Sequence, residues 1–167
     1  VVSPASNTNY TVTGTSSGGC VNSAVLSVSV NALPTLTAGA SSTVICAGNA
    51  ATITAGGATT YTWNTGPTTN TVAVSPSTNT NYTVAGTSVV SGCSNTAVQS
   101  ISVNALPNVT TNASSTVLCT GKTATITASN ASSYVWNTGQ TTNTLAVSPI
   151  SNISYTVTGT SAVTGCS

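Results

Sequence analysis

The stretch YTWNTGPTTNTVAVSPSTNTNYTVAGTS at 61–88 alternates short apolar runs with turn residues. Within it, TVAVS at 71–75 places Val72 and Val74 on one side of an extended chain, because successive side chains of a strand point to opposite faces. Asn-Thr-Gly and Ser-Pro, which favour turns, separate the runs. A period of two bounded by turn signals predicts antiparallel strands, and no stretch has a helical period of useful length.

The same alternation continues outward from this stretch. It recurs in AATITA at 50–55, NYTVAG at 81–86 and AVQSISV at 97–103. About seven short, Thr-rich strands in so few residues predict a compact, all-β, antiparallel sandwich of the immunoglobulin-like kind.

A repeat organises the whole chain. Residues 34–94 align without gaps on residues 107–167, with 39 identities in 61 positions and an offset of 73 residues. Residues 1–33 match the end of the same unit, with one deletion. The motif Asn-Ala-Leu-Pro stands at both junctions with no flexible linker, which predicts a stiff, closely stacked array. The predicted domains are 1–33 (the C-terminal part of an immunoglobulin-like repeat), 34–106 (a complete repeat) and 107–167 (a repeat lacking its last strand).

The composition excludes most chemistry. Among 167 residues there is one Lys, Lys122, and no Arg, Asp, Glu or His. General acid–base catalysis, carboxylate-bound Ca²⁺ or Mg²⁺, zinc coordination and phosphate recognition each need residues of the missing types. No apolar run approaches the roughly 18 residues of a membrane span. We therefore expect no enzyme activity, no cofactor or metal, no nucleic-acid partner and no membrane insertion.

The five cysteines follow the repeat. Cys46 and Cys93 are 47 residues apart, as are Cys119 and Cys166, and Cys20 aligns with Cys93. The spacing predicts one disulfide within each repeat, Cys46–Cys93 and Cys119–Cys166, with the partner of Cys20 before residue 1; reduced, buried thiols are the alternative. Disulfides indicate an oxidising, extracellular compartment.

Four aromatic residues are expected in the core. Trp63 and Trp136 each stand in a Tyr-x-Trp-Asn-Thr-Gly run, and a Trp on such a strand favours core packing over a sugar-stacking platform. Tyr82 and Tyr155 begin a later strand and are predicted to pack at a corner of the sandwich.

These residues resemble a known family. The Trp-x-x-Gly turn, the Val-Ser-Pro corner, the Tyr-x-Val strand and the Gly-Cys loop are similar to the immunoglobulin-like (PKD-like) repeats of very long surface proteins in Bacteroidota, including gliding adhesins. The resemblance covers the whole chain and implies export and display as a filament at the bacterial cell surface. Family members usually carry acidic residues near the Gly-Cys pair; this chain has Thr-Ser-Val-Val-Ser there, which puts a calcium-dependent role in doubt.

The first functional hypothesis is a non-enzymatic structural repeat of an extracellular filament or adhesin stalk, whose partners are neighbouring repeats and other copies of itself. The alternative is an adhesin module that binds a glycan or protein through its loops. Ice binding by arrays of Thr is a remote third. The turns WNTGPTTN and WNTGQTTN hardly differ between repeats, which favours a shared structural role.

Overall fold

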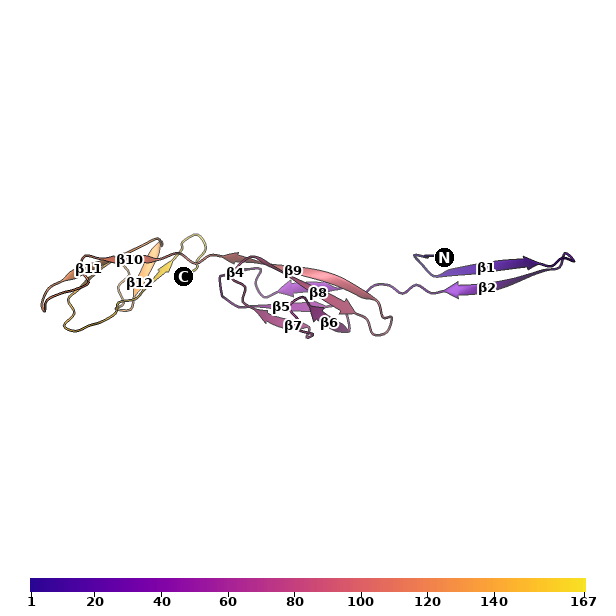
Figure 1. Ribbon diagram of the computed structural model, residues 1–167, viewed down its shortest axis with the longest axis horizontal. Helices are drawn as coiled ribbons and strands as arrows, with labels where there is room; N and C mark the ends of the chain where they lie inside the picture. Colours follow the sequence, from indigo (N-terminus) through magenta and orange to yellow (C-terminus); the bar gives the residue numbers. More distant parts are fainter. The chain divides into compact units, whose positions relative to one another are not determined.

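The computed structural model describes residues 1–167 as fourteen strands and no helix, so the all-β prediction is confirmed (Figure 1). Nothing in it has the helical length and apolar character that a membrane crossing by helix would need. By packing, the chain divides into two units, and its strands are described below by their pairing. They consist of residues 1–38, 55–70 and 83–97, and of residues 39–54, 71–82 and 98–167.

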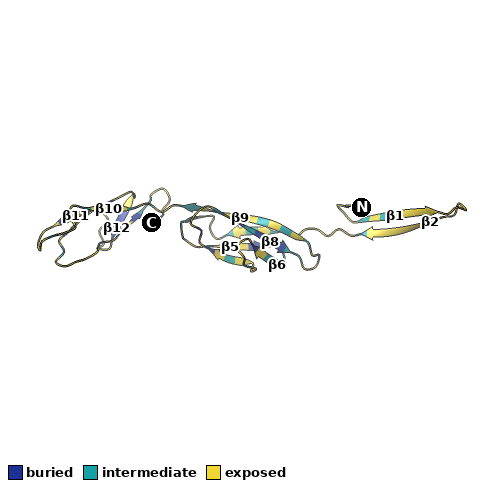
Figure 2. Cartoon of the chain, viewed as in Figure 1, coloured by how far each residue is buried: buried dark blue, intermediate teal, exposed yellow.

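The chain begins with a hairpin. Strand β1 (Thr8–Thr15) pairs antiparallel with β2 (Val21–Val28), and the register runs from Thr8↔Val28 to Thr15↔Val21. Nearly all of its residues are exposed (Figure 2). Val12 and Leu26 are each 68% exposed, so this hairpin keeps its apolar side chains in contact with solvent.

Residues 34–106 form seven strands, as the sequence predicts. They are arranged in two sheets, with orders β3-β5-β7 and β4-β9-β8-β6, which is consistent with a β-sandwich. One pair departs from the antiparallel expectation, because β4 runs parallel to the end of β9. The strands are β3 (Thr37–Ala40), β4 (Val44–Cys46), β5 (Ala51–Gly56), β6 (Thr60–Trp63), β7 (Thr71–Val74), β8 (Thr80–Thr87) and β9 (Ser94–Asn104).

Burial in these strands follows the predicted period of two. In β5, Ala51, Ile53 and Ala55 are buried, whereas Thr52 and Thr54 between them are exposed. The strand therefore presents one apolar face and one hydroxyl face, and the apolar face supplies its share of the core.

Residues 107–167 form five strands in two sheets, with orders β10-β11-β13 and β12-β14. Ala124 pairs with Val147 across β11 and β13, and Trp136 pairs with Val157 across β12 and β14, both antiparallel. The strands are β10 (Thr110–Ala113), β11 (Ala124–Ser129), β12 (Ser133–Trp136), β13 (Thr144–Val147) and β14 (Val157–Thr160).

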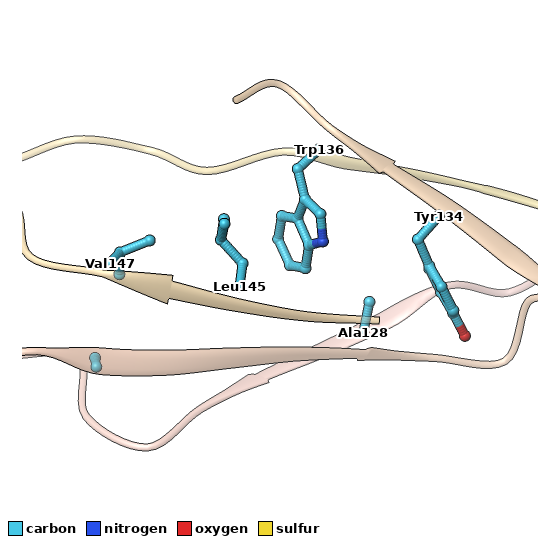
Figure 3. Close-up of a cluster of buried hydrophobic side chains, with 6 residues drawn as sticks. Ala128, Tyr134, Trp136, Leu145 and Val147 are labelled. Atoms are coloured by element: carbon cyan, nitrogen blue, oxygen red, sulfur yellow. The ribbon is translucent and has the colours of Figure 1, made fainter. Parts of the chain in front are cut away.

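The core of residues 107–167 lies between these two sheets (Figure 3). Trp136 and Tyr134 of β12 face Leu145 and Val147 of β13 and Ala128 of β11. The Trp136 indole Nε1 donates a hydrogen bond of 2.9 Å to the Thr142 carbonyl, so its one polar atom is satisfied although the ring is buried.

Two strands of residues 34–106, β4 and β8, are missing or shorter at the corresponding positions of residues 107–167. Residues 117–119, which correspond to β4, form no strand, and β14 covers only the last half of the span that corresponds to β8. In residues 34–106 the pairing partner of β4 is β9. Residues 117–119 pair with no strand; the Val117 amide instead donates a hydrogen bond of 3.3 Å to the Ser115 hydroxyl, and the Cys119 carbonyl accepts one of 3.0 Å from the Lys122 amide.

Candidate functional site

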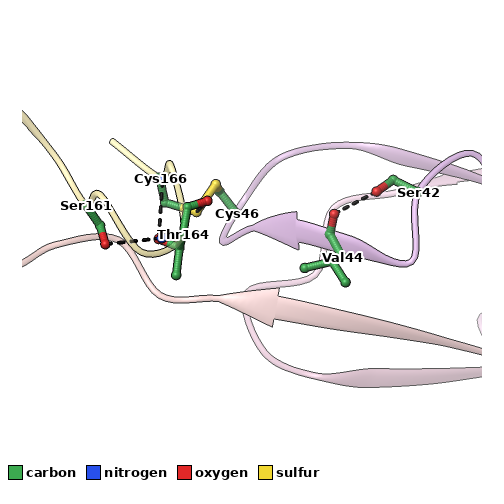
Figure 4. The surroundings of a disulfide bond; sticks show 6 residues. All are labelled: Ser42, Val44, Cys46, Ser161, Thr164 and Cys166. Carbon is green, nitrogen blue, oxygen red and sulfur yellow. Dashed lines mark hydrogen bonds between the residues drawn. A yellow bond between two sulfur atoms is a disulfide. The ribbon is translucent and has the colours of Figure 1, made fainter.

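The chain contains one disulfide, and it joins the two long segments. Cys46 of residues 34–106 is bonded to Cys166 of residues 107–167, across a sequence separation of 120 residues, with the Cα atoms 5.6 Å apart (Figure 4). Cys166 is fully buried. The bond therefore fixes residues that the sequence assigns to two successive repeats.

Cys46 is placed by the parallel pairing of β4 with β9. Its backbone partner is Asn104, the last residue of β9 and the first of the Asn-Ala-Leu-Pro junction. The next amide, that of Ala47, donates a hydrogen bond of 2.9 Å to the Asn104 carbonyl. A tight turn follows, in which the Asn49 amide bonds the Cys46 carbonyl at 2.9 Å and Gly48 adopts a φ of 83°. Cys46 is thus held where the chain leaves its segment.

Cys166 is placed by the loop that follows β14. The Ser161 amide donates to the Cys166 carbonyl at 2.9 Å, and the Gly165 amide donates to the Ser161 carbonyl at 2.8 Å. The Cys166 amide is 3.3 Å from the Thr164 hydroxyl (Figure 4). Ser161 and Thr164 also line a hollow of about 370 Å³ with Ala105, Leu106 and Pro107 of the junction. The loop therefore carries Cys166 to the junction where Cys46 lies.

The predicted pairing within each repeat is wrong. Cys46 is not bonded to Cys93 and Cys119 is not bonded to Cys166; Cys93 and Cys119 are free thiols. The reason is the length of β9. Cys46 pairs with its last residue, whereas Cys93 directly precedes its first. A strand advances about 3.3 Å per residue, so this eleven-residue strand spans about 35 Å, against the roughly 7 Å that a disulfide allows between Cα atoms.

The free cysteines lie at other positions in the fold. The Cys93 sulfur is 3.9 Å from the carbonyl oxygen of Asn31, the residue that corresponds to Asn104 at the preceding junction. Cys119 and Cys20 are exposed. The expectation that Cys20 has a partner before residue 1 stays a prediction.

Three of the four predicted core aromatics are buried, namely Trp63, Trp136 and Tyr82. Tyr155 is only partly buried and packs against the edge of the core in residues 107–167. Sequence reasoning missed Tyr134, which is buried and whose hydroxyl both donates to the Ala131 carbonyl and accepts from the Ala131 amide, each at 3.0 Å. The signal was present, because Tyr134 is the first residue of the Tyr-x-Trp motif.

The site's chemistry is that of a covalent cross-link. Around the disulfide lie hydroxyls and backbone amides, such as those of Ser161 and Thr164, and no group of three or more His, Cys, Asp or Glu occurs anywhere in the structure. Comparison with protein-family models and with curated proteins gives no match to the chain.

Proposed function

We propose that the chain is a structural repeat unit of an extracellular filament or adhesin stalk, displayed at a bacterial cell surface. The observation that carries this proposal is the Cys46–Cys166 disulfide, which closes the junction between successive segments instead of stapling one segment to itself. Such a bond links the two segments covalently in addition to the backbone, which is what a fibre under tension needs.

The strand order supports an immunoglobulin-like repeat. In residues 34–106 the first strands, β3 and β4, belong to different sheets, and the last strands, β8 and β9, pair beside β6. The first strands, β3 and β4, each lie at an edge of a sheet, and antiparallel sheets with edge strands of this kind are found in immunoglobulin-like sandwiches. The kinship with repeats of long Bacteroidota surface proteins is part of this proposal and is supported by the sequence motifs, such as the Trp-x-x-Gly turn and the Gly-Cys loop.

The surface and the thiol chemistry support the proposed location and partners. Disulfides persist in oxidising compartments, which favours an extracellular setting. With a net charge of +1 there is little electrostatic repulsion between copies, and charged side chains are what usually protects edge strands from pairing. Association with other copies of the chain is therefore favoured over solubility as a monomer.

Electron microscopy of the purified, oxidised chain over a range of concentrations tests this proposal. We expect linear particles whose axial repeat is roughly 35–40 Å per sandwich, from strands of about 6–7 residues and their loops along the axis. Size-exclusion chromatography with light scattering gives the matching mass. Compact monomers at high concentration that bind a glycan array would favour the binding-module alternative and reject the structural role.

A further inference from the structure

The two long segments differ in a way that adds side-chain amides to one of them. With 39 identities in 61 aligned positions, residues 34–94 and 107–167 differ at the remaining 22. Three of these differences give the later segment an Asn that stands two residues before a Ser or Thr. The new residues are Asn108 in place of Thr35, Asn112 in place of Gly39 and Asn130 in place of Gly57. Each completes the triplet Asn-x-Ser/Thr, the acceptor signal for a sugar bonded to Asn.

Such triplets also arise elsewhere, because Ser and Thr are abundant in this chain. They stand at Asn9, Asn81 and Asn152. Asn81 lies on β8, between β9 and β6, and its side-chain oxygen accepts a hydrogen bond of 2.8 Å from the Ser100 hydroxyl. What distinguishes the three new residues is their place in the fold, since they gather at one edge of a sheet.

The three new Asn residues lie on or beside the edge strand β10. This strand is the outermost of the sheet β10-β11-β13, and Asn112 lies on it, opposite Thr127 of β11. Asn108 precedes the strand by two residues. Asn130 directly follows β11, and its amide nitrogen donates a hydrogen bond of 3.1 Å to the hydroxyl of Thr110, the first residue of β10. All three are exposed, as are the Ser and Thr residues of their triplets.

Asn130 keeps the backbone conformation of the glycine that it replaces. Its φ is 71° and that of Gly57 is 90°, both in the left-handed region, which Asn tolerates better than most residues. The turn is therefore retained and gains a side-chain amide. One hydrogen of that amide makes the bond to Thr110, and because an amide nitrogen carries two hydrogens, the other can be replaced by a sugar.

We propose that Asn108, Asn112 and Asn130 are attachment sites for N-linked glycans. In the transfer, the side-chain nitrogen forms a bond to the anomeric carbon of a lipid-linked oligosaccharide diphosphate. The bond from that carbon to the phosphate oxygen breaks, the lipid diphosphate leaves with the electron pair, and the nitrogen loses one proton. The inference rests on the proposed function in one respect, the export of the chain, because sugars of this kind are a feature of secreted proteins.

Glycans at these positions would limit how β10 can associate. An edge strand presents unpaired backbone groups to a second chain, and proteins commonly block it with charged side chains. Strand β10 carries no charged residue. Bulky, solvated sugars on either side of Thr110 would occupy the space in which another strand pairs. The corresponding edge strand of residues 34–106, β3, carries no such triplet.

The test uses the native secreted chain, reduced, digested with chymotrypsin and analysed by mass spectrometry with electron-transfer fragmentation, which leaves sugars on their side chains. Sugar masses are expected on Asn108, Asn112 and Asn130. Asn143 is the matched control, because it is exposed in the same segment but has Leu145 two residues on, and it should be unmodified. Bare Asn at all three positions, or sugars on Ser and Thr hydroxyls alone, would overturn the proposal.

Two variants made in the producing cells separate the sugar signal from the fold. Thr110→Ser should keep the sugar on Asn108 and Thr110→Ala should remove it, because only the former retains the hydroxyl that the triplet needs. Asn112 depends on Ser114 instead, so its occupancy should be the same in both variants. Thr110 is exposed, and equal melting temperatures would show that the loss is not due to misfolding. An Asn108 that keeps its sugar in Thr110→Ala would contradict the assignment.

The two proposals fail in different ways. Linear particles in electron micrographs whose Asn108, Asn112 and Asn130 are all bare would reject this inference and leave the structural role standing. Sugars on these residues in a chain that is a compact monomer would support the sites and reject the filament.

Discussion

Cys46 stands opposite Asn104, so the first cysteine of one segment lies where the chain passes into the next. The bond to Cys166 joins that position to the following segment. Residues 47–165 lie inside the loop that this bond closes, and tension applied to the two ends of the chain would bypass them.

Loss of the disulfide should lower the stability of the residues inside the loop that it closes, 47–165. We expect Cys46→Ser to cost about 4–5 kcal/mol, because a loop of this size loses that much closure entropy in the unfolded state on the chain-entropy account. Thermal unfolding followed by circular dichroism measures the change. Cys119→Ser is the control, because the Cys119 thiol is exposed and unbonded. The melting temperature of this variant should match that of the parent chain. Equal losses in both variants would mean that Cys46 makes no special contribution.

A methyl group at Gly159 should strain the core. A Cβ there would lie 2.5 Å from Val109 Cγ2 and 2.6 Å from Ala131 Cβ. Gly159→Ala is therefore expected to destabilise by about 1–3 kcal/mol, the usual cost of overpacking. Gly14 occupies the corresponding position in the hairpin and has no neighbour within 4 Å, so Gly14→Ala should leave the unfolding curve unchanged. A Gly159→Ala chain as stable as the parent would show that the close approach is not real.

Trp136 should be the most costly side chain to remove from residues 107–167. It is 2% exposed and packs between both sheets, so Trp136→Ala should cost about 3–5 kcal/mol. Val163→Ala is the matched truncation at a position that is 94% exposed, and it should change stability by less than about 0.5 kcal/mol. Chemical denaturation followed by circular dichroism compares them. Similar midpoints for the two variants would contradict the assigned core.

The sequence indicated the strands well because their signal is local. Ala51 and Ile53 alternate with Thr52 and Thr54, and a period of two requires no knowledge of what each strand pairs with. The burial of Trp63 and Trp136 could also be predicted from local sequence, because each stands in the same Tyr-x-Trp-Asn-Thr-Gly run that ends in a turn.

The cysteine pairing was predicted wrongly because it depends on tertiary geometry. Equal separations of 47 residues agree with bonds within repeats and equally with bonds between them. What decides is that β4 runs parallel to β9 and meets its far end, and neither the direction of that pairing nor the length of β9 can be read from the residues around Cys46. Tyr155 packs against the core of residues 107–167 and is partly buried.

Stability should hardly vary with acidity between about pH 4 and about pH 7. A dependence on pH requires groups that bind protons differently in the folded and unfolded states, and the side chains that ordinarily titrate in this range, Asp, Glu and His, are absent. Melting temperatures measured at intervals across the range should agree within error. A fall of many degrees on acidification would indicate that a charged group outside this sequence, such as a glycan, supports the fold.

The measurement that tests the junction bond most directly is single-molecule pulling between residues 1 and 167, with and without a reductant. In the oxidised chain the loop between Cys46 and Cys166 should stay closed at forces that unfold the strands. Reduction should then add one step of about 400 Å, the extended length of 120 residues at about 3.4 Å each. Two steps of about 160 Å would instead mean bonds within each repeat, and equal final lengths with and without reductant would mean no bond at all. Either of those results would contradict the account.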